Sequence, residues 1–168
     1  MKISIGARDM YAFQMYHTYH SPNGIMSLIL SVAAFAVVIF AHAKLEPFYI
    51  AAYIIAGIVF LLYYPVILKG KASLAISASP VLSHPLLYTF DERGITVTAD
   101  DKAMVETSEN SATLPWESVY KVAQTKDLIL IYSNKINAYI LPVSQISDLD
   151  GIKALIKEKL PDHRVVLK

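Results

Sequence analysis

Side chains that could carry out chemistry are few and widely spaced in this sequence. There is no cysteine, which excludes thiolate catalysis, disulfide bonds and cysteine-ligated zinc. His17 and His20 lie three residues apart, a spacing at which two imidazoles on a helix can face one metal ion. No acidic residue or cysteine lies nearby to complete the ligand set, and His42, His84 and His163 each stand alone. We therefore predict no metal site and no cofactor.

Two pairs of neighbouring carboxylates have the residue type that general acid–base catalysis uses. Asp91 and Glu92 form one pair, and Asp100 and Asp101 form the other. Each pair lies at a predicted turn, where acidic residues are favoured because they hydrogen-bond the local backbone. The sequence also lacks G-x-S-x-G, P-loop, G-x-G-x-x-G and H-E-x-x-H motifs. Since no acid, base and nucleophile can be combined into one site, we predict that the protein is not an enzyme.

Charge is scarce and unevenly distributed along the 168 residues. Charged residues make up 17% of the chain, whereas a soluble domain carries about 25%. The net charge of +1 excludes nucleic acid as the main partner, because such binding depends on a basic surface. Lys44 and Glu46 are the only charged residues between positions 11 and 67, and they separate two apolar runs at 25–43 and 47–68.

Each apolar run is about 20 residues long, enough for a helix to cross the hydrocarbon core of a bilayer. Neither run has the amphipathic stripe of a helix packed on a soluble core. We predict a two-helix transmembrane hairpin over residues 24–69. Two alternatives are a pair of buried helices in a globular protein and a signal peptide cleaved at the A-x-A-like residues 41–43. Small residues four apart make the candidate helix contacts: Ser27 and Ser31 on the first helix, Ala52 and Ala56 on the second.

The flanking segments predict the orientation of the hairpin. Lys2, Arg8, Lys69 and Lys71 lie on the side of the two tails, and Lys44 alone lies in the loop. This bias predicts that both termini are cytoplasmic. The aromatic stretch at 8–20 is expected to be a helix that ends at the turn cluster 21–24. Residues 1–23 are interpreted as an interfacial amphipathic helix; the alternative is that this helix docks on the cytoplasmic domain.

The C-terminal half changes to a pattern of short strands after a linker over residues 70–85. Strands are expected at 86–91, 95–99, 112–116, 119–125, 128–133 and 136–141, followed by an amphipathic helix over 146–160. Apolar residues occupy both faces of the strand at 128–133, which predicts that it is buried on both sides. The predicted fold class is a membrane α-helical hairpin plus an α+β cytoplasmic domain at 86–168. That domain is expected to be a PH-like antiparallel β barrel or sandwich capped by a C-terminal helix.

Several of these segments resemble a known family. F-D-E-R-G-I at 90–95, L-P-W-E-S-V-Y-K-V at 114–122, I-L-I-Y at 129–132 and Y-I-L-P at 139–142 are similar, in this order, to the YcxB-like bacterial membrane proteins. D-M-Y-A-F at 9–13 resembles the aromatic segment of that family. The resemblance implies two N-terminal spans, a YcxB-like C-terminal domain and a place in the bacterial inner membrane, and it assigns no molecular function. The family commonly continues I-L-P with basic residues, whereas this chain continues with Val143-Ser144-Gln145, so a basic patch is not expected there.

The expected function is therefore a membrane-anchored interaction or regulatory module that binds a protein partner at the inner membrane surface. The candidate contacts are Trp116, Glu92 and Arg93; tryptophan dominates binding hot spots, but a core position is favoured for Trp116, because it lies among strand residues and large aromatic side chains dominate cores. The alternative function is a lipid- or small-ligand-sensing membrane protein that acts as an oligomer through self-association. Capture of inositol phosphates is disfavoured, because the first hairpin turn carries Asp91 and Glu92 rather than a basic cluster.

Overall fold

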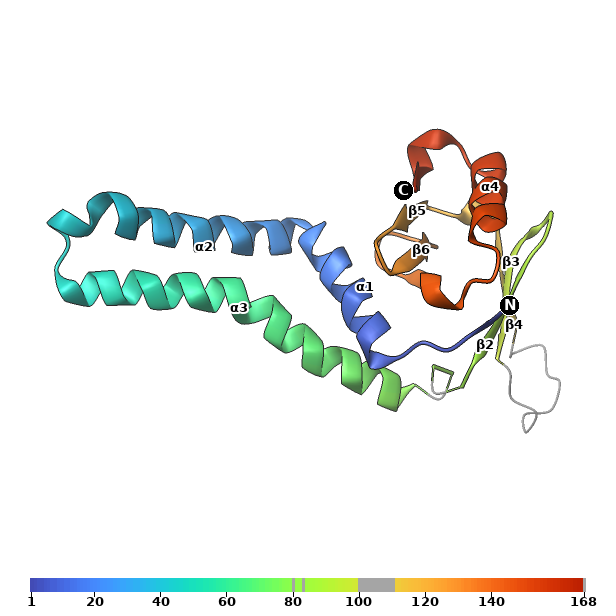
Figure 1. The fold of residues 1–168 in the computed structure, drawn as a ribbon, viewed down its shortest axis with the longest axis horizontal. Helices are drawn as coiled ribbons and strands as arrows, with labels where there is room; N and C mark the ends of the chain where they lie inside the picture. Colours follow the sequence, from blue (N-terminus) through green and yellow to red (C-terminus); the bar gives the residue numbers. More distant parts are fainter. Residues whose placement is uncertain (80, 83, 100–110, 168) are drawn as a thin grey trace. The chain divides into compact units, whose positions relative to one another are not determined.

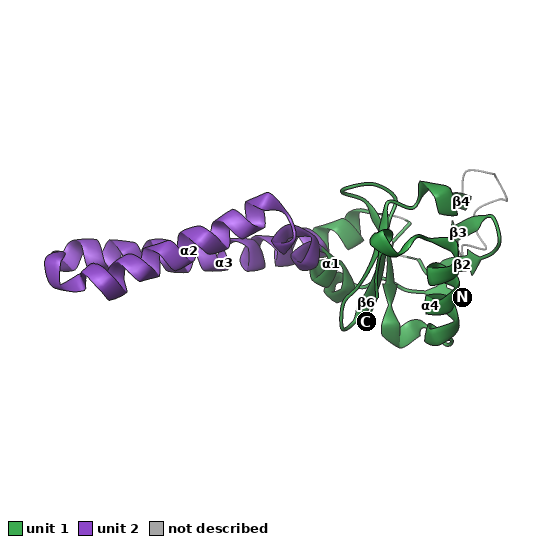
Figure 2. Ribbon diagram, turned by 90° about the horizontal axis from the view of Figure 1, so that it is seen from above, with its two compact units in different colours: residues 1–13, 73–168 green, residues 14–72 purple. Residues whose placement is uncertain are grey.

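The computed structural model describes residues 1–79, 81–82, 84–99 and 111–167. The chain divides into two compact units (Figure 2). Residues 14–72 form one unit, which contains most of the helical hairpin, and residues 1–13 together with 73–168 form the other. The second acidic pair of the sequence, Asp100 and Asp101, lies outside the described residues.

Two long helices make up most of residues 14–72 (Figure 1). Helix α2 (Pro22–Ala41) is followed by a 3₁₀ turn over His42–Lys44 and by helix α3 (Pro47–Ala78). Ser21 caps α2 by accepting a hydrogen bond from the Gly24 N–H, and a proline in the first turn of each helix removes an N–H that would lack a partner there. Pro65 lies inside α3, which continues to Ala78.

The apolar side chains of the hairpin point outward rather than into a protein core. The most apolar 18-residue stretch of each helical segment is largely exposed. In the segment Pro22–Lys44, 22% of that stretch is buried, and in Pro47–Ala78 the buried share is 6%. The side chains of Phe40 and Phe48 are 87% and 75% exposed. A core helix of a soluble protein would bury such residues. The helices are thus long and apolar enough to cross a membrane, as predicted, and their exposure argues against the buried-helix alternative.

The first sheet of the other unit has the order β1-β2-β3-β4 and is antiparallel throughout. Its strands are β1 (Lys2–Ile3), β2 (Leu86–Phe90), β3 (Gly94–Ala99) and β4 (Ser111–Pro115). Strand β2 buries alternate residues, as expected for a strand with one face on a core. β1 pairs with β2 through Ile3 and Leu86, which brings the N-terminal segment into this sheet.

The N-terminal segment is tied to the rest of its unit at two further places. The amino group of Met1 donates a 2.7 Å hydrogen bond to the carbonyl of Tyr88. The side chain of Gln145 bonds both the N–H and the carbonyl of Ser4, at 2.7 and 2.8 Å. Helix α1 (Ala7–Tyr19) follows, one residue from the predicted bounds. Residues 1–13 therefore belong to the strand-rich unit, whereas the sequence assigned residues 1–23 to one separate segment.

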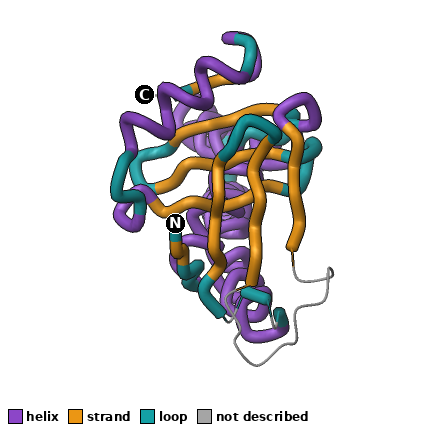
Figure 3. Tube along the Cα trace, turned by 90° about the vertical axis from the view of Figure 1, so that its right-hand side faces the viewer, coloured by secondary structure: helices purple, strands orange, loops and turns teal. Residues whose placement is uncertain are grey.

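The second sheet has the order β7-β6-β5-β8. Its strands are β5 (Lys121–Gln124), β6 (Leu128–Tyr132), β7 (Ala138–Pro142) and the short β8 (Val165–Val166), which pairs in parallel with β5. All five residues of β6 are buried, as predicted from its apolar residues on both faces. Figure 3 shows the strands of this sheet running across those of the first sheet.

Helix α4 (Leu149–Lys159) completes the unit. Asp148 caps it by accepting a 2.9 Å hydrogen bond from the Gly151 N–H, and its buried side chain is Ile156. The predicted α+β character, the six strands β2–β7 and the C-terminal helix are confirmed. The barrel alternative is not: the described strands form two separate four-stranded sheets. β1 and β8, two residues each, were not predicted.

Candidate functional site

The turn between β2 and β3 is built from Asp91, Glu92, Arg93 and Gly94. The Asp91 carboxylate accepts hydrogen bonds from the N–H groups of Arg93 (2.8 Å) and Gly94 (3.0 Å). These two backbone hydrogen bonds lower the pKa of Asp91, and the positive charge of the Arg93 guanidinium lowers it further by a smaller amount. Gly94 has a φ of +156°, and a Cβ at this position would lie 2.2 Å from the carbonyl oxygen of Leu114. Glycine is therefore required where β3 leaves the turn.

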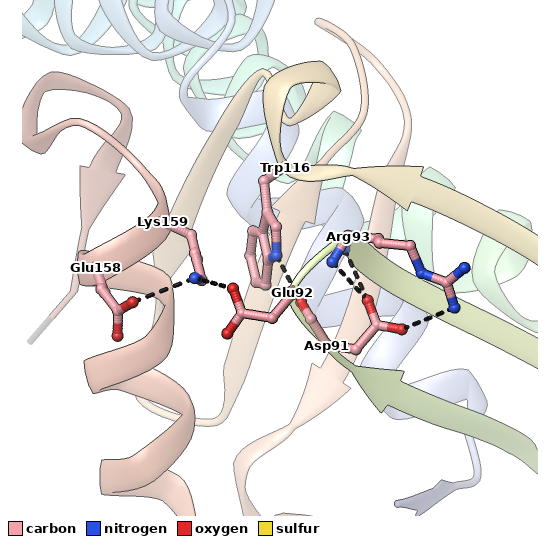
Figure 4. Close-up of polar contacts among 7 residues, drawn as sticks. Asp91, Glu92, Arg93, Trp116, Glu158 and Lys159 are labelled. Atoms are coloured by element: carbon pink, nitrogen blue, oxygen red, sulfur yellow. Dashed lines mark hydrogen bonds and ion pairs between the residues drawn. The ribbon is translucent and has the colours of Figure 1, made fainter.

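Trp116 holds this turn in place through a contact with its backbone (Figure 4). Its indole N–H donates a 2.9 Å hydrogen bond to the carbonyl of Asp91, and its side chain is 6% exposed. Its ring packs near Phe90, with 6.4 Å between the ring centroids. The sequence left Trp116 either at an interface or in the core, and the structure places it in the core. Trp116 supports the surface turn and does not itself present a contact surface.

Glu92 is linked to helix α4 through Lys159 (Figure 4). The Lys159 ammonium donates to the carboxylate of Glu92 at 2.5 Å and lies 3.2 Å from that of Glu158. The hydrogen bond to Glu92, followed by the one to Glu158, raises the pKa of Lys159. The Lys159 side chain is 19% exposed, whereas that of Glu92 is 84% exposed. Exposed ion pairs contribute little stability, so the main effect is to hold Glu92 in one place. Lys159 was not singled out from the sequence, because the contact joins residues 67 positions apart.

Arg93 is the most accessible side chain of the turn. It is 89% exposed and lies 3.7 Å from the Asp91 carboxylate. The three side chains thus differ in role: Asp91 orders the backbone, Glu92 is exposed but paired with Lys159, and Arg93 is the most exposed positive charge of the turn. This arrangement suits polar recognition of a partner. Among the described residues, no group of three or more His, Asp or Glu side chains could hold a metal ion.

Residues 90–158 match the protein family described as YcxB-like protein. The chain carries a YcxB-like domain. No curated protein and no solved structure matches the chain. The match begins at the last residue of β2 and ends within α4, so the YcxB-like segment includes Glu92, Arg93 and Trp116. It leaves out β1 and most of β2, which complete the first sheet.

The helices that precede the YcxB-like domain contact each other through two serines. The hydroxyl of Ser27 donates to the carbonyl of Phe60 (2.6 Å), and that of Ser31 donates to the carbonyl of Gly57 (2.9 Å). Both serines are buried, and such interhelical bonds are a common means of helix association in lipid. On α3 the predicted contacts differ: Ala52 is exposed and Ala56 half-buried. Gly57 takes the contact position instead.

Replacing Gly57 by leucine is expected to weaken the hairpin by about 1–3 kcal/mol, the typical cost of overpacking. A Cβ at position 57 would lie 2.8 Å from the ring of Phe35, so the helices must separate and the Ser31 bond must lengthen. The measurement is an SDS unfolding titration. Unfolding is monitored by energy transfer between two dyes, each attached to one introduced cysteine, with one cysteine in each helix. Ala52→Leu is the matched control, because Ala52 is exposed. An unchanged titration for Gly57→Leu would contradict this contact.

Proposed function

We propose that this chain is a membrane-anchored interaction module without catalytic chemistry. In this proposal its YcxB-like domain binds a protein partner at the cytoplasmic surface of a bacterial inner membrane. The observation that carries the proposal is the ordered β2–β3 turn. Its two outermost side chains, Glu92 and Arg93, are 84% and 89% exposed, while its backbone is held by Asp91 and Trp116. A surface that is ordered before binding loses less conformational entropy when the partner docks.

The connections of the hairpin support its proposed topology. Residues 1–13 and 73–168 belong to one unit, and β1 pairs with β2, so the segments before α2 and after α3 lie on the same side of any membrane that the hairpin crosses. The basic residues of these segments, Lys2, Arg8, Lys69 and Lys71, support the cytoplasm as that side.

A PH-like architecture of the domain is part of the proposal. It is supported by two four-stranded sheets whose strands cross, followed by the C-terminal helix α4. In this arrangement β1 and β8 are additions at one edge of each sheet. A PH-like domain without a basic first hairpin is suited to protein contacts rather than to phosphoinositides.

The test is photo-crosslinking in intact membranes from a photoreactive amino acid at position 93 of the full chain. Arg93 is the better position, because a change at Glu92 would also break its contact with Lys159. The matched control carries the same amino acid at Lys135, an exposed residue between β6 and β7. One dominant protein adduct from position 93, absent from position 135, is expected. The same adducts from both positions would contradict a specific site.

The second candidate function is lipid or small-ligand sensing by an oligomer. It is favoured by one observation, an apolar pocket of about 450 Å³ within residues 1–13 and 73–168. In the crosslinking experiment, adducts between copies of this chain or with lipids alone would favour this candidate over a protein partner.

A further inference from the structure

The apolar pocket lies where the two sheets and the two connecting segments of the hairpin come together within one unit. Strands β2, β3 and β7 supply seven of its fifteen lining residues. Met10 and Phe13 line it from the segment that leads into the hairpin, and Val81 lines it from the segment that follows α3. Its volume of about 450 Å³ falls in the range of small-molecule sites in proteins.

The pocket has a buried interior and an exposed apolar rim. Tyr88 and Val97 line the interior and are 1% and 8% exposed, whereas Val81 and Ile136 line the rim and are 55% and 68% exposed. Apolar side chains around the mouth of an apolar pocket favour entry of a molecule that is itself apolar, because its hydrocarbon leaves water on binding.

The polar groups of the pocket are few and uncharged. Tyr88, Tyr139 and Asn137 line it, and no charged side chain is among its described lining residues. The rings of Tyr88 and Tyr139 lie 6.3 Å apart and perpendicular. Burial of the Tyr88 side chain raises the pKa of its phenol, and the electrostatic effect of the nearby Tyr139 raises it further. The phenol therefore keeps its proton and can donate a hydrogen bond. Among these described lining residues, a buried ligand charge would find no partner of opposite sign, which is costly.

We propose that this pocket binds a neutral, chain-like lipid: one aliphatic chain that ends in an uncharged oxygen-bearing group, such as the glycerol ester of a monoacylglycerol. The chain fills the apolar interior, and the Tyr88 and Tyr139 hydroxyls and the Asn137 amide hydrogen-bond the oxygen. The ligand contacts both connecting segments of the hairpin, so occupancy stabilises their contact with the sheets. This inference goes beyond the protein partner proposed above and does not depend on it.

The test uses the full chain in lipid nanodiscs that contain a trace of monoacylglycerol with a photoreactive diazirine in its chain. Labelling is mapped by mass spectrometry of peptides. Adducts are expected on peptides that contain Tyr88 and Tyr139, in addition to those on the lipid-exposed helices. Val97→Trp fills the interior and is expected to reduce labelling of these two peptides about tenfold, while Tyr88→Phe removes one hydrogen bond and reduces it about threefold to tenfold.

Leu87→Trp is the matched control, since Leu87 neighbours Tyr88 on β2 but is 44% exposed and does not line the pocket. It is expected to label like the unchanged chain. A thermal melt by circular dichroism checks that each variant is folded; if Val97→Trp is not, Ala138→Leu, also in the pocket lining, takes its place with the same expected reduction.

Competition tests whether the labelling is specific. Excess unlabelled monoacylglycerol in the disc is expected to displace the probe from the peptides that contain Tyr88 and Tyr139, which supports the pocket. Adducts confined to residues 22–78 would overturn the proposal. So would equal labelling of the folded Val97→Trp variant and the unchanged chain. Neither outcome affects the crosslinking result at position 93, so the two proposals fail independently.

Discussion

Replacing Trp116 by alanine is expected to lower the free energy of unfolding of the YcxB-like domain by about 3–5 kcal/mol. Trp116 is 6% exposed and packs near Phe90, so the change removes a large buried ring and leaves a cavity. The Asp91 carbonyl also loses its hydrogen bond from the indole N–H. Since domains are stable by only about 5–15 kcal/mol, this single change removes a large share of the total.

The measurement is urea denaturation of the full chain in detergent micelles, monitored by far-ultraviolet circular dichroism. Trp116→Phe is the informative comparison, because it keeps most of the buried ring but lacks the N–H group. It is expected to cost about 1–3 kcal/mol, the penalty for a polar group left without its partner. A Trp116→Ala variant as stable as the unchanged chain would show that this side chain lies on the surface after all.

Replacing Ile3 by alanine is expected to destabilise the strand-rich unit by about 2–5 kcal/mol, as for other buried large-to-small changes. Ile3 is fully buried and pairs with Leu86 through β1 and β2. Hydrogen exchange of the β2 amides in the full chain measures the effect locally, and faster exchange over Leu86–Phe90 is expected.

Ser4→Ala is the control for this experiment. Ser4 is exposed and bonds Gln145 only through its backbone atoms in the two hydrogen bonds described above, so the change is expected to stay within about 0.5 kcal/mol. If residues 1–23 formed only an interfacial helix, Ile3→Ala would leave exchange in β2 unchanged. The two outcomes therefore separate the observed arrangement from a purely interfacial N-terminal helix.

Strands and helices with a strong local pattern could be predicted from the sequence. The alternation of apolar residues and the turn residues between them located β2–β7 to within about two residues, and two uncharged runs predicted the hairpin. Strands β1 and β8 could not be found this way, because two residues carry no periodicity. Their partners lie far away in the chain, as in the pairs Ile3–Leu86 and Val122–Val165.

The candidate sites could be predicted only in part, because local patterns do not determine which faces meet. Ser27 and Ser31 lie in the helix contact, yet the spacing of Ala52 and Ala56 did not show that α3 turns Gly57 toward α2. Glu92 and Arg93 were candidate contacts from the sequence, but the ion pair between Lys159 and Glu92 depends on the tertiary fold. The pocket likewise combines residues from 5 to 140, which no local pattern brings together.

The pairing of β1 with β2 also determines the order of events during synthesis. Ile3 leaves the ribosome long before its partner Leu86; at about 5–20 residues per second the delay is on the order of ten seconds. During this time β1 has no strand with which to pair, and both apolar helices are synthesised. The first sheet therefore cannot close until both apolar helices have been synthesised, and slower synthesis prolongs the exposure of the unpaired N-terminal strand to chaperones and proteases.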